Sequence, residues 1–273
     1  MRRALSQYLT VTGTYWGFTL SDGALRILVL FHFFKLGYSP FSLALLFLMY
    51  EVAGIIANLG GGWLATRFGI PRMLLLGIAM QILGLLFLSC IDPTFGPVLS
   101  VIWVVVAQGI SGLAKDITKT ASKSAIKVVK IDEGEGLFRW VAWFTGSKNA
   151  MKGVGFFLGG VMLTTIGFRG GLWLMAGLLG LLAVLVVFTL PSKLGAGVSS
   201  RTIKELLSKS SAVNTIALAR IFLFGARDTW FVVALPVFLY RNGWSFWEVG
   251  GFLALWTMLY GLVQGMAPAI MRI

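Results

Sequence analysis

Long apolar segments recur along the whole sequence of 273 residues. Each is roughly long enough to cross about 30 Å of hydrocarbon at 1.5 Å per residue, and the backbone inside lipid must satisfy its own hydrogen bonds. A share of 58% hydrophobic and 12% charged residues excludes a soluble globule and a disordered chain. The sequence therefore predicts an all-α polytopic membrane protein with eight helices, near residues 8–34, 41–65, 73–91, 98–124, 138–166, 170–190, 211–239 and 246–271.

Cysteine and histidine usage excludes several kinds of chemistry. Cys90 is the only cysteine, so an internal disulfide and a thiolate metal cluster are both excluded. His32 is the only histidine, and we interpret it as a packed or interfacial residue. We expect neither a metal nor a cofactor. The basic N-terminus resembles that of a signal peptide, but the apolar stretch behind it carries Asp22 and Arg26 and lacks a cleavage pattern, which favours a retained first span.

The distribution of basic residues predicts the orientation of the helices. With a cytoplasmic N-terminus, fifteen basic residues fall in or beside the cytoplasmic connections, and three, Lys35, Arg169 and Arg241, fall on the outside. This asymmetry favours a cytoplasmic N-terminus. Most of the net charge of +13 is then a topology signal, and it calls for no nucleic-acid partner.

An offset of 206 residues aligns the first predicted helical hairpin with the last. Identical residues then coincide at Phe18 and Phe224, at Asp22 and Asp228, at Gly37 and Gly243, and at Ser39 and Ser245. Six helices separate equivalent points, so we expect a parallel repeat of six helices. This predicts an N-terminal half over 1–190, a cytoplasmic linker over 191–210 and the first two helices of a second half over 211–273. A complete pair would hold twelve helices in roughly 400 residues, so we expect a truncated chain with about eight of the twelve.

Two sets of six helices with a cytoplasmic linker resemble the major facilitator superfamily. Residues 62–69, GWLATRFG, resemble its Gly-x-Leu-Ala-Asp-Arg-x-Gly signature, with Thr66 in place of the acid. The glycines Gly146, Gly155 and Gly159 keep part of the spacing of the antiporter signature on helix 5. Because glycines let helices approach closely, we favour a packing role for these three residues.

Charged residues inside the predicted spans are the main functional signal. An ionisable residue at the bilayer centre costs about 2.5–3.5 kcal/mol on insertion scales, so it faces a partner or a wet cavity. Seven basic and four acidic residues lie at this depth, and the surplus of three cations favours a multiply charged anionic substrate. The basic ones are Arg26, Lys115, Lys119, Lys148, Lys152, Arg220 and Arg227, and the acidic ones are Asp22, Glu51, Asp116 and Asp228.

Structural interpretations of the same charges remain open. Asp22 and Arg26 are four residues apart and can pair on one helix face, and Asp228 adjoins Arg227. Lys123 and Lys127 fit side chains that extend to the cytoplasmic surface. By contrast, Lys148 and Lys152 are like charges four residues apart with no local acid, which favours contact with substrate.

Longer stretches are similar to the organoarsenical-efflux branch of the superfamily, the ArsJ-type permeases. They are residues 15–26 (YWGFTLSDGALR), 111–116 (SGLAKD), 138–140 (FRW), 145–157 (TGSKNAMKGVGFF) and 222–228 (FLFGARD). The resemblance implies export of 1-arseno-3-phosphoglycerate from the cytoplasm across a bacterial inner membrane, giving arsenate resistance. It also implies a functional link to glyceraldehyde-3-phosphate dehydrogenase, which makes this ester when arsenate replaces phosphate.

The leading hypothesis is alternating access around a site at the membrane midplane. The candidate substrate-binding residues are Arg26, Lys115, Lys148, Asn149, Lys152, Arg220 and Arg227, and Asp22, Glu51 and Asp228 are candidates for charge pairing or for carrying a coupling proton. One alternative is a permease for another organophosphate or organic anion. Two others are a membrane interaction subunit that does not transport and an intramembrane serine protease, since residues 109–112 (GISG) match a nucleophile pattern although His32 precedes the serine.

Overall fold

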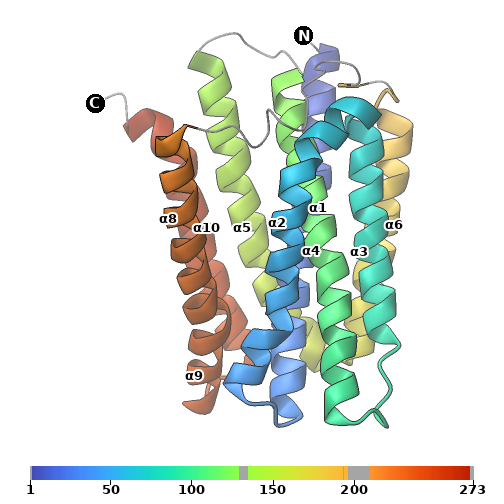
Figure 1. Cartoon of the computed structure of the whole chain (residues 1–273), viewed down its shortest axis with the longest axis vertical. Coiled ribbons are helices and arrows are strands. Elements are labelled where there is room, and N and C mark those ends of the chain that lie inside the picture. Colours follow the sequence, from blue (N-terminus) through green and yellow to red (C-terminus); the bar gives the residue numbers. More distant parts are fainter. Residues whose placement is uncertain (1, 129–134, 193, 196–209, 271–273) are drawn as a thin grey trace.

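The computed structural model describes residues 2–128, 135–192, 194–195 and 210–270. All regular elements in these ranges are helices, and they run roughly parallel to one long axis (Figure 1). They are α1 (Arg2–Lys35), α2 (Pro40–Phe68), α3 (Ile70–Ser89), α4 (Pro97–Val128), α5 (Glu135–Thr165), α6 (Gly167–Thr189), α8 (Ser211–Asp228), η1 (Thr229–Ala234), α9 (Leu235–Arg241) and α10 (Phe246–Ile270).

The all-α polytopic architecture predicted from the sequence is confirmed. Within the described ranges, six helices are long and apolar enough to cross a membrane: Leu5–Lys35, Pro40–Ala57, Ile70–Ser89, Pro97–Ala125, Gly167–Thr189 and Phe246–Ala269. The helix α5, which carries Lys148 and Lys152 near its middle, is not among these six. The predicted span 211–239 is not one uniform helix, because the π-helical η1 separates α8 from α9.

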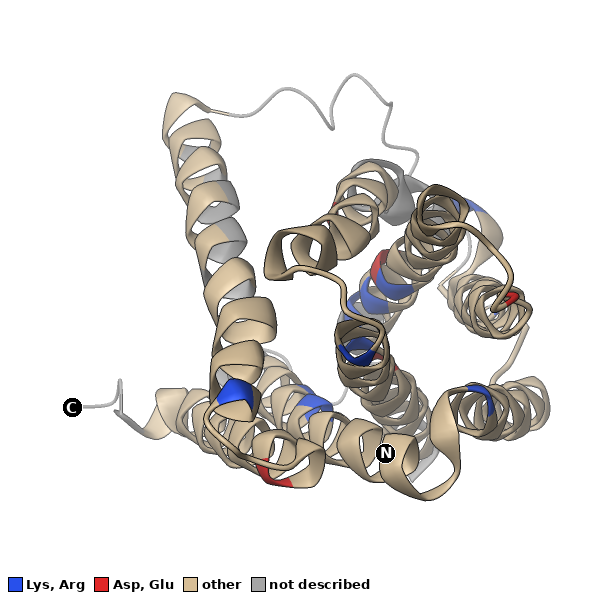
Figure 2. Ribbon diagram, turned by 90° about the horizontal axis from the view of Figure 1, so that it is seen from below, with Lys and Arg blue, Asp and Glu red and all other residues tan. Residues whose placement is uncertain are grey.

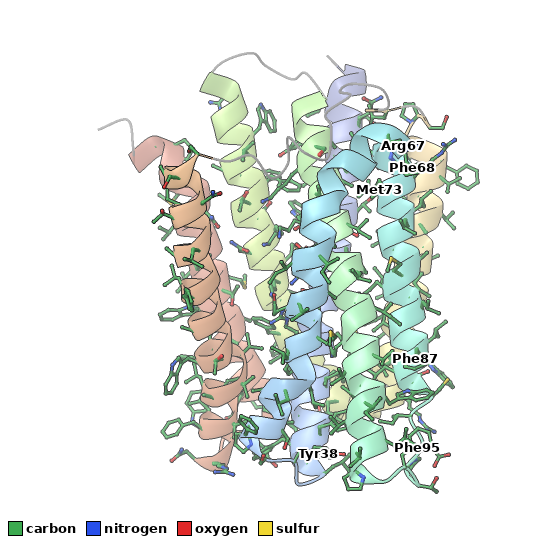
Figure 3. The ribbon with its side chains drawn as sticks, viewed as in Figure 1. Tyr38, Arg67, Phe68, Met73, Phe87 and Phe95 are labelled. Atoms are coloured by element: carbon green, nitrogen blue, oxygen red, sulfur yellow. The ribbon has the colours of Figure 1, made fainter. Side chains whose placement is uncertain are left out.

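The helices alternate in direction along the chain, with α8, η1 and α9 continuing one another, so the connections fall at two ends of the bundle. The start of α1 and the end of α10 lie at one end in Figure 1, together with the connection between α2 and α3. Figure 3 shows Arg67, Phe68 and Met73 at this end, and Tyr38 and Phe95 at the other. The ends of α1 and α9, with Lys35 and Arg241, lie at the end that is opposite the N-terminus. The bundle therefore separates the two groups of loops as the sequence predicts, while their assignment to the cytoplasm or the exterior stays a prediction.

The two hairpins that align at an offset of 206 residues have the same turn. Gly37 and Gly243 both adopt a positive φ, of 88° and 91°. Tyr38 donates its backbone N–H to Phe33 at 3.2 Å, and Trp244 donates to Leu239 at 3.2 Å. The glycine N–H groups bond to Phe34 and Tyr240 at 3.0 and 3.1 Å. Both helix ends are thus Schellman motifs, which place a glycine where the backbone turns left-handed.

Glycines set the close contacts between the helices that carry the charged residues. A Cβ built on Gly23 of α1 would lie 2.5 Å from the Lys152 carbonyl oxygen of α5, and one on Gly159 would lie 2.5 Å from the Ala24 carbonyl oxygen. Likewise Gly155 faces Leu20 of α1, and Gly146 faces Gly261 of α10. The three glycines of the partial antiporter signature therefore lie in helix contacts, as the packing interpretation predicts.

The segment after α6 is hydrogen-bonded to the turn between α2 and α3. Ile70 donates its backbone N–H to the Leu194 carbonyl oxygen at 2.9 Å. Gly195 has a φ of 75°, and a Cβ there would lie 2.5 Å from Ile70 Cδ1. Most of the predicted linker over 191–210, namely residue 193 and residues 196–209, lies outside the described residues.

Candidate functional site

The middle of α1 places two charged side chains inside the bundle. Asp22 and Arg26 are only 3% and 2% exposed, and their spacing of four residues puts them on one helix face. The Arg26 guanidinium lies 2.5 Å from Oε1 of Glu51 on α2. Asp22 Oδ2 lies 3.9 Å from Nζ of Lys152 on α5. Both α1 charges therefore have partners on neighbouring helices, beyond the pairing within one helix that the sequence suggests.

The helix α4 extends this cluster through Lys115, Asp116 and Lys119. Lys115 Nζ lies 3.3 Å from Glu51 Oε2 and 3.6 Å from Asp116 Oδ2. Lys119 Nζ lies 2.5 Å from Asp116 Oδ1. Gly54 of α2 leaves room for the buried Asp116 carboxylate, since a Cβ there would collide with it. The result is a chain of alternating charges that runs across α4, α2 and α1.

Tyr50 of α2 stands at the centre of the cluster, and the sequence analysis did not single it out. Its side chain is fully buried, and its hydroxyl donates a hydrogen bond to Asp22 Oδ1. The Arg26 guanidinium carbon lies 4.3 Å from the centre of its ring, and Lys115 Nζ lies 4.0 Å from it. Both distances are within the range of cation–π attraction. The available signal was a tyrosine directly before an intramembrane glutamate.

The helix α5 contributes Lys148, Asn149 and Lys152. Asn149 donates its side-chain amide to Gln264 Oε1 of α10 at 2.6 Å, so it joins two helices. Among the residues that the structure describes, no carboxylate lies within 4 Å of Lys148 Nζ. Lys148 thus differs from Arg26, Lys115 and Lys152, each of which has a carboxylate partner.

The described cluster keeps a positive surplus. It contains five basic side chains, from Arg26, Lys115, Lys119, Lys148 and Lys152, against three acidic ones, from Asp22, Glu51 and Asp116. Figure 2 shows basic and acidic positions on the ribbon in the middle of the bundle. The side chains of the other candidates, Arg220, Arg227 and Asp228, lie outside those that the structure describes, although the α8 backbone that carries them is described.

Aromatic contacts fix α1 against α5 on the N-terminal side of the charges. The rings of Tyr15 and Phe144 stack with their centres 5.1 Å apart. Trp16 Nε1 donates a hydrogen bond to Ser147 Oγ at 3.0 Å. Because Ser147 directly precedes Lys148, these contacts fix the part of α5 that presents the lysine.

A cavity of about 550 Å³ lies at the opposite end of the bundle, beside the connection between α3 and α4. His32 and Phe168 both line it, and their rings stack at 3.9 Å between centres. The packed histidine expected from the sequence is therefore confirmed. Ser111 lies fourteen residues into α4 and His32 three from the end of α1, so about 16 Å of helical rise separates them. This arrangement provides no serine–histidine pair. Among the described residues, no group of three His, Cys, Asp or Glu side chains could hold a metal ion.

An apolar bundle of helices of membrane-spanning length, with a charge cluster inside it, is the architecture of a multi-pass membrane protein. The sequence matches the Major Facilitator Superfamily over residues 9–273, and the chain belongs to this superfamily. This family excludes the intramembrane serine protease, since its members are transporters rather than enzymes. No curated protein matches the chain in sequence.

Solved structures of transporters have the same fold. A bacterial homologue of the human drug peptide transporters PepT1 and PepT2 matches with a TM-score of 0.70 at 13% identity, over 99% of this chain and 71% of that one. Tetrameric PepTSo2 gives 0.59 at 14% identity, over 88% and 52%. A D-xylose–proton symporter gives 0.58 at 16% identity, over 98% and 68%. The chain thus spans between about half and 71% of the length of these structures.

Proposed function

We propose that the protein is a permease that moves a small, multiply charged organic anion across the membrane by alternating access. The observation that carries this proposal is Lys148, a cation in the middle of α5 with no carboxylate within 4 Å among the described side chains. A half-buried cation without a nearby counter-charge is costly, so binding is favoured for a ligand that brings negative charge to it.

The contacts divide the candidate residues into two groups. Arg26 is already neutralised by Glu51 at 2.5 Å, and Lys115 lies between Glu51 and Asp116. These two cations support the site. In this proposal Lys148 binds the anion first, and Lys152, 3.9 Å from Asp22, exchanges this long ion pair for the ligand. Arg220 and Arg227 remain candidates for the second anionic end of the substrate.

The specific substrate that we propose is 1-arseno-3-phosphoglycerate, exported to give arsenate resistance. The resemblance of residues 15–26 and 145–157 to organoarsenical-efflux permeases supports it. An arsenate group and a phosphate group at its two ends suit several cations at membrane depth. The proposal includes a cytoplasmic N-terminus in a bacterial inner membrane and a link to glyceraldehyde-3-phosphate dehydrogenase, which would supply the ester.

The mechanism that we propose is rocking of a half over 1–190 against one that begins near 211, joined by a linker over 191–210. The contact between α5 and α10, with Asn149 and Gln264 in it, would lie at the boundary between these halves. A coupling proton is part of the proposal, with Asp22, Glu51 and Asp228 as its candidate carriers. The similar fold of a D-xylose–proton symporter supports coupling of this kind.

A second candidate substrate is another organophosphate, because the same cations would bind a phosphate group without arsenic. The test uses everted membrane vesicles supplied with the dehydrogenase, its nucleotide, glyceraldehyde 3-phosphate and either arsenate or phosphate. We expect arsenic to accumulate inside vesicles only when the ester can form. Accumulation of phosphoglycerates without any arsenic uptake would favour the second candidate.

Variants test the site in the same vesicles. Lys148→Ala should reduce arsenic uptake at least about tenfold, the effect of losing a charge-assisted contact of roughly 1.5–3 kcal/mol. Lys148→Arg should keep part of it. The matched control is Lys35→Ala, which removes a lysine at the end of α1 that lies over the Phe246 ring instead. Full uptake by a well-expressed Lys148→Ala protein would overturn the site.

A further inference from the structure

We infer that Tyr50 is a positioning residue of the anion site, which holds Asp22 so that Lys152 can leave it for the substrate. The inference rests on the proposed function and adds a residue to it. Tyr50 itself is fully buried, and the Asp22 carboxylate accepts its hydroxyl proton. Its role would be to stabilise a neighbouring charge rather than to bind the ligand.

The two oxygens of Asp22 have different partners. Oδ1 accepts the hydrogen bond from Tyr50, and Oδ2 faces Lys152 Nζ at 3.9 Å. This distance is longer than that of a charge-assisted hydrogen bond, which is about 2.7–2.9 Å. Because Tyr50 stabilises the carboxylate from one side, Lys152 is held without close contact on the other. At Asp22, an arriving anion therefore competes with a long ion pair rather than a short one.

Tyr50 also stabilises the carboxylate when the substrate is bound. If Lys152 moves to the anion, Asp22, which is 3% exposed, loses positive charge beside it. A buried carboxylate with no donor is costly, so the tyrosine hydroxyl lowers the cost of that movement. A phenylalanine at this position would leave Asp22 to draw Lys152 into closer contact.

The ring of Tyr50 has a second role toward Arg26 and Lys115. Both cations lie over it, at 4.3 and 4.0 Å from its centre, and both bond to the adjacent Glu51. The adjacent residues Tyr50 and Glu51 thus hold Arg26 of α1 and Lys115 of α4 in position. The close approach of α4 depends on Gly112, which packs against the Tyr50 carbonyl. Substitution by phenylalanine separates the roles, because it keeps the ring and removes the hydroxyl.

The test measures the reactivity of Lys152 in the full chain without any ligand. Purified protein is pulsed with acetic anhydride, and the acetylation of Lys152 is compared with that of Lys35 by peptide mass spectrometry. In Tyr50→Phe we expect the acetylation of Lys152 to fall at least about threefold relative to the wild type. This is the size of effect expected when one buried hydrogen bond is redistributed. A purely structural defect would loosen the site and raise acetylation.

Transport supplies the second measurement. In everted vesicles, Tyr50→Phe should raise the KM for the enzymatically formed ester about 3–10-fold, with a maximal rate close to that of the wild type. The matched control is Tyr8→Phe, which removes the hydroxyl of another buried tyrosine. The Tyr8 hydroxyl donates to the Trp140 carbonyl at 3.4 Å, and Tyr8 lies fourteen residues before Asp22 in the sequence. Tyr8→Phe should change neither quantity.

The outcomes separate this inference from the proposed function. Wild-type vesicles that take up no ester would refute the proposed substrate, while the acetylation of Lys152 would still decide the role of Tyr50. Unchanged or increased acetylation of Lys152 in a folded Tyr50→Phe protein would overturn the inference. So would an unchanged KM in vesicles whose wild-type protein transports.

Discussion

Gly23 of α1 lies directly against the main-chain carbonyl of Lys152 on α5. A Cβ at position 23 would be 2.5 Å from that oxygen and 3.3 Å from Lys152 Cγ. The contact sits beside Asp22, which pairs with the same lysine. The missing side chain of a glycine thus determines how closely two charged side chains can approach.

Gly23→Ala should separate α1 from α5 and destabilise the protein by about 1–3 kcal/mol, the usual cost of overpacking. It should also weaken substrate binding, because Lys152 moves with its backbone. Gly13→Ala on the same helix is the control, since a Cβ there meets nothing within 4 Å. Thermal unfolding of both purified variants in detergent measures the loss of stability. Equal unfolding midpoints for the two variants would contradict the prediction.

Glu51→Gln should destabilise the protein because it removes the carboxylate that lies 2.5 Å from Arg26, whose side chain is 3% exposed. We expect a loss of about 1–3 kcal/mol, below the range for a fully buried pair, since the Glu51 side chain is 43% exposed. The double variant Arg26→Met with Glu51→Met should recover most of it, because no charge is left alone. A double variant as unstable as Glu51→Gln would argue against this account.

Asn149 and Gln264 should show a measurable coupling between α5 and α10. Each single change to leucine removes one partner of a 2.6 Å hydrogen bond. A double-mutant cycle on unfolding free energies should give a coupling of about 0.6 kcal/mol, the average for side-chain hydrogen bonds within membranes. Strictly additive effects would show that the bond contributes nothing to stability.

Asp92 gives a pH-dependent contribution in the connection between α3 and α4. The side-chain hydroxyl and backbone N–H of Thr94 both donate to its Oδ1 at 2.7 Å, and these bonds lower the pKa of Asp92 below 3.8. A lowered folded-state pKa adds stability above the unfolded-state value, and this is lost as the pH falls through the folded-state pKa. The difference in unfolding midpoint between wild type and Asp92→Ala should therefore shrink between about pH 6 and about pH 3. A constant difference would contradict it.

The hydropathy of the sequence predicts the helices and their turns well. Gly37 and Gly243, which coincide at the offset of 206 residues, both adopt a positive φ. The π-helical segment Thr229–Ala234 escaped prediction, because its residues, TWFVVA, continue the apolar pattern on either side. Hydropathy measures the environment of a segment, and it does not distinguish two hydrogen-bonding patterns inside the same apolar helix.

The candidate site was predictable as a set of charges, but its pairing was not. Spacing within one helix suggests that Asp22 pairs with Arg26, and it does not reveal that Lys152 of α5 and Glu51 of α2 are also their partners. Which faces of two helices meet depends on glycine contacts between distant parts of the chain. Tyr50 was missed for the same reason: a tyrosine in an apolar helix acquires its role only from the carboxylate that folding brings to its hydroxyl.

The hydrogen bond between Ile70 and Leu194 has a practical consequence for protein engineering. Epitope tags and fluorescent reporters are commonly inserted into connections between transmembrane helices. An insertion between Pro191 and Gly195 would break this backbone hydrogen bond and the contact of Gly195 with the Ile70 side chain. A reporter placed there would perturb the start of α3 as well, so its signal would mix the state of the connection with damage to the fold.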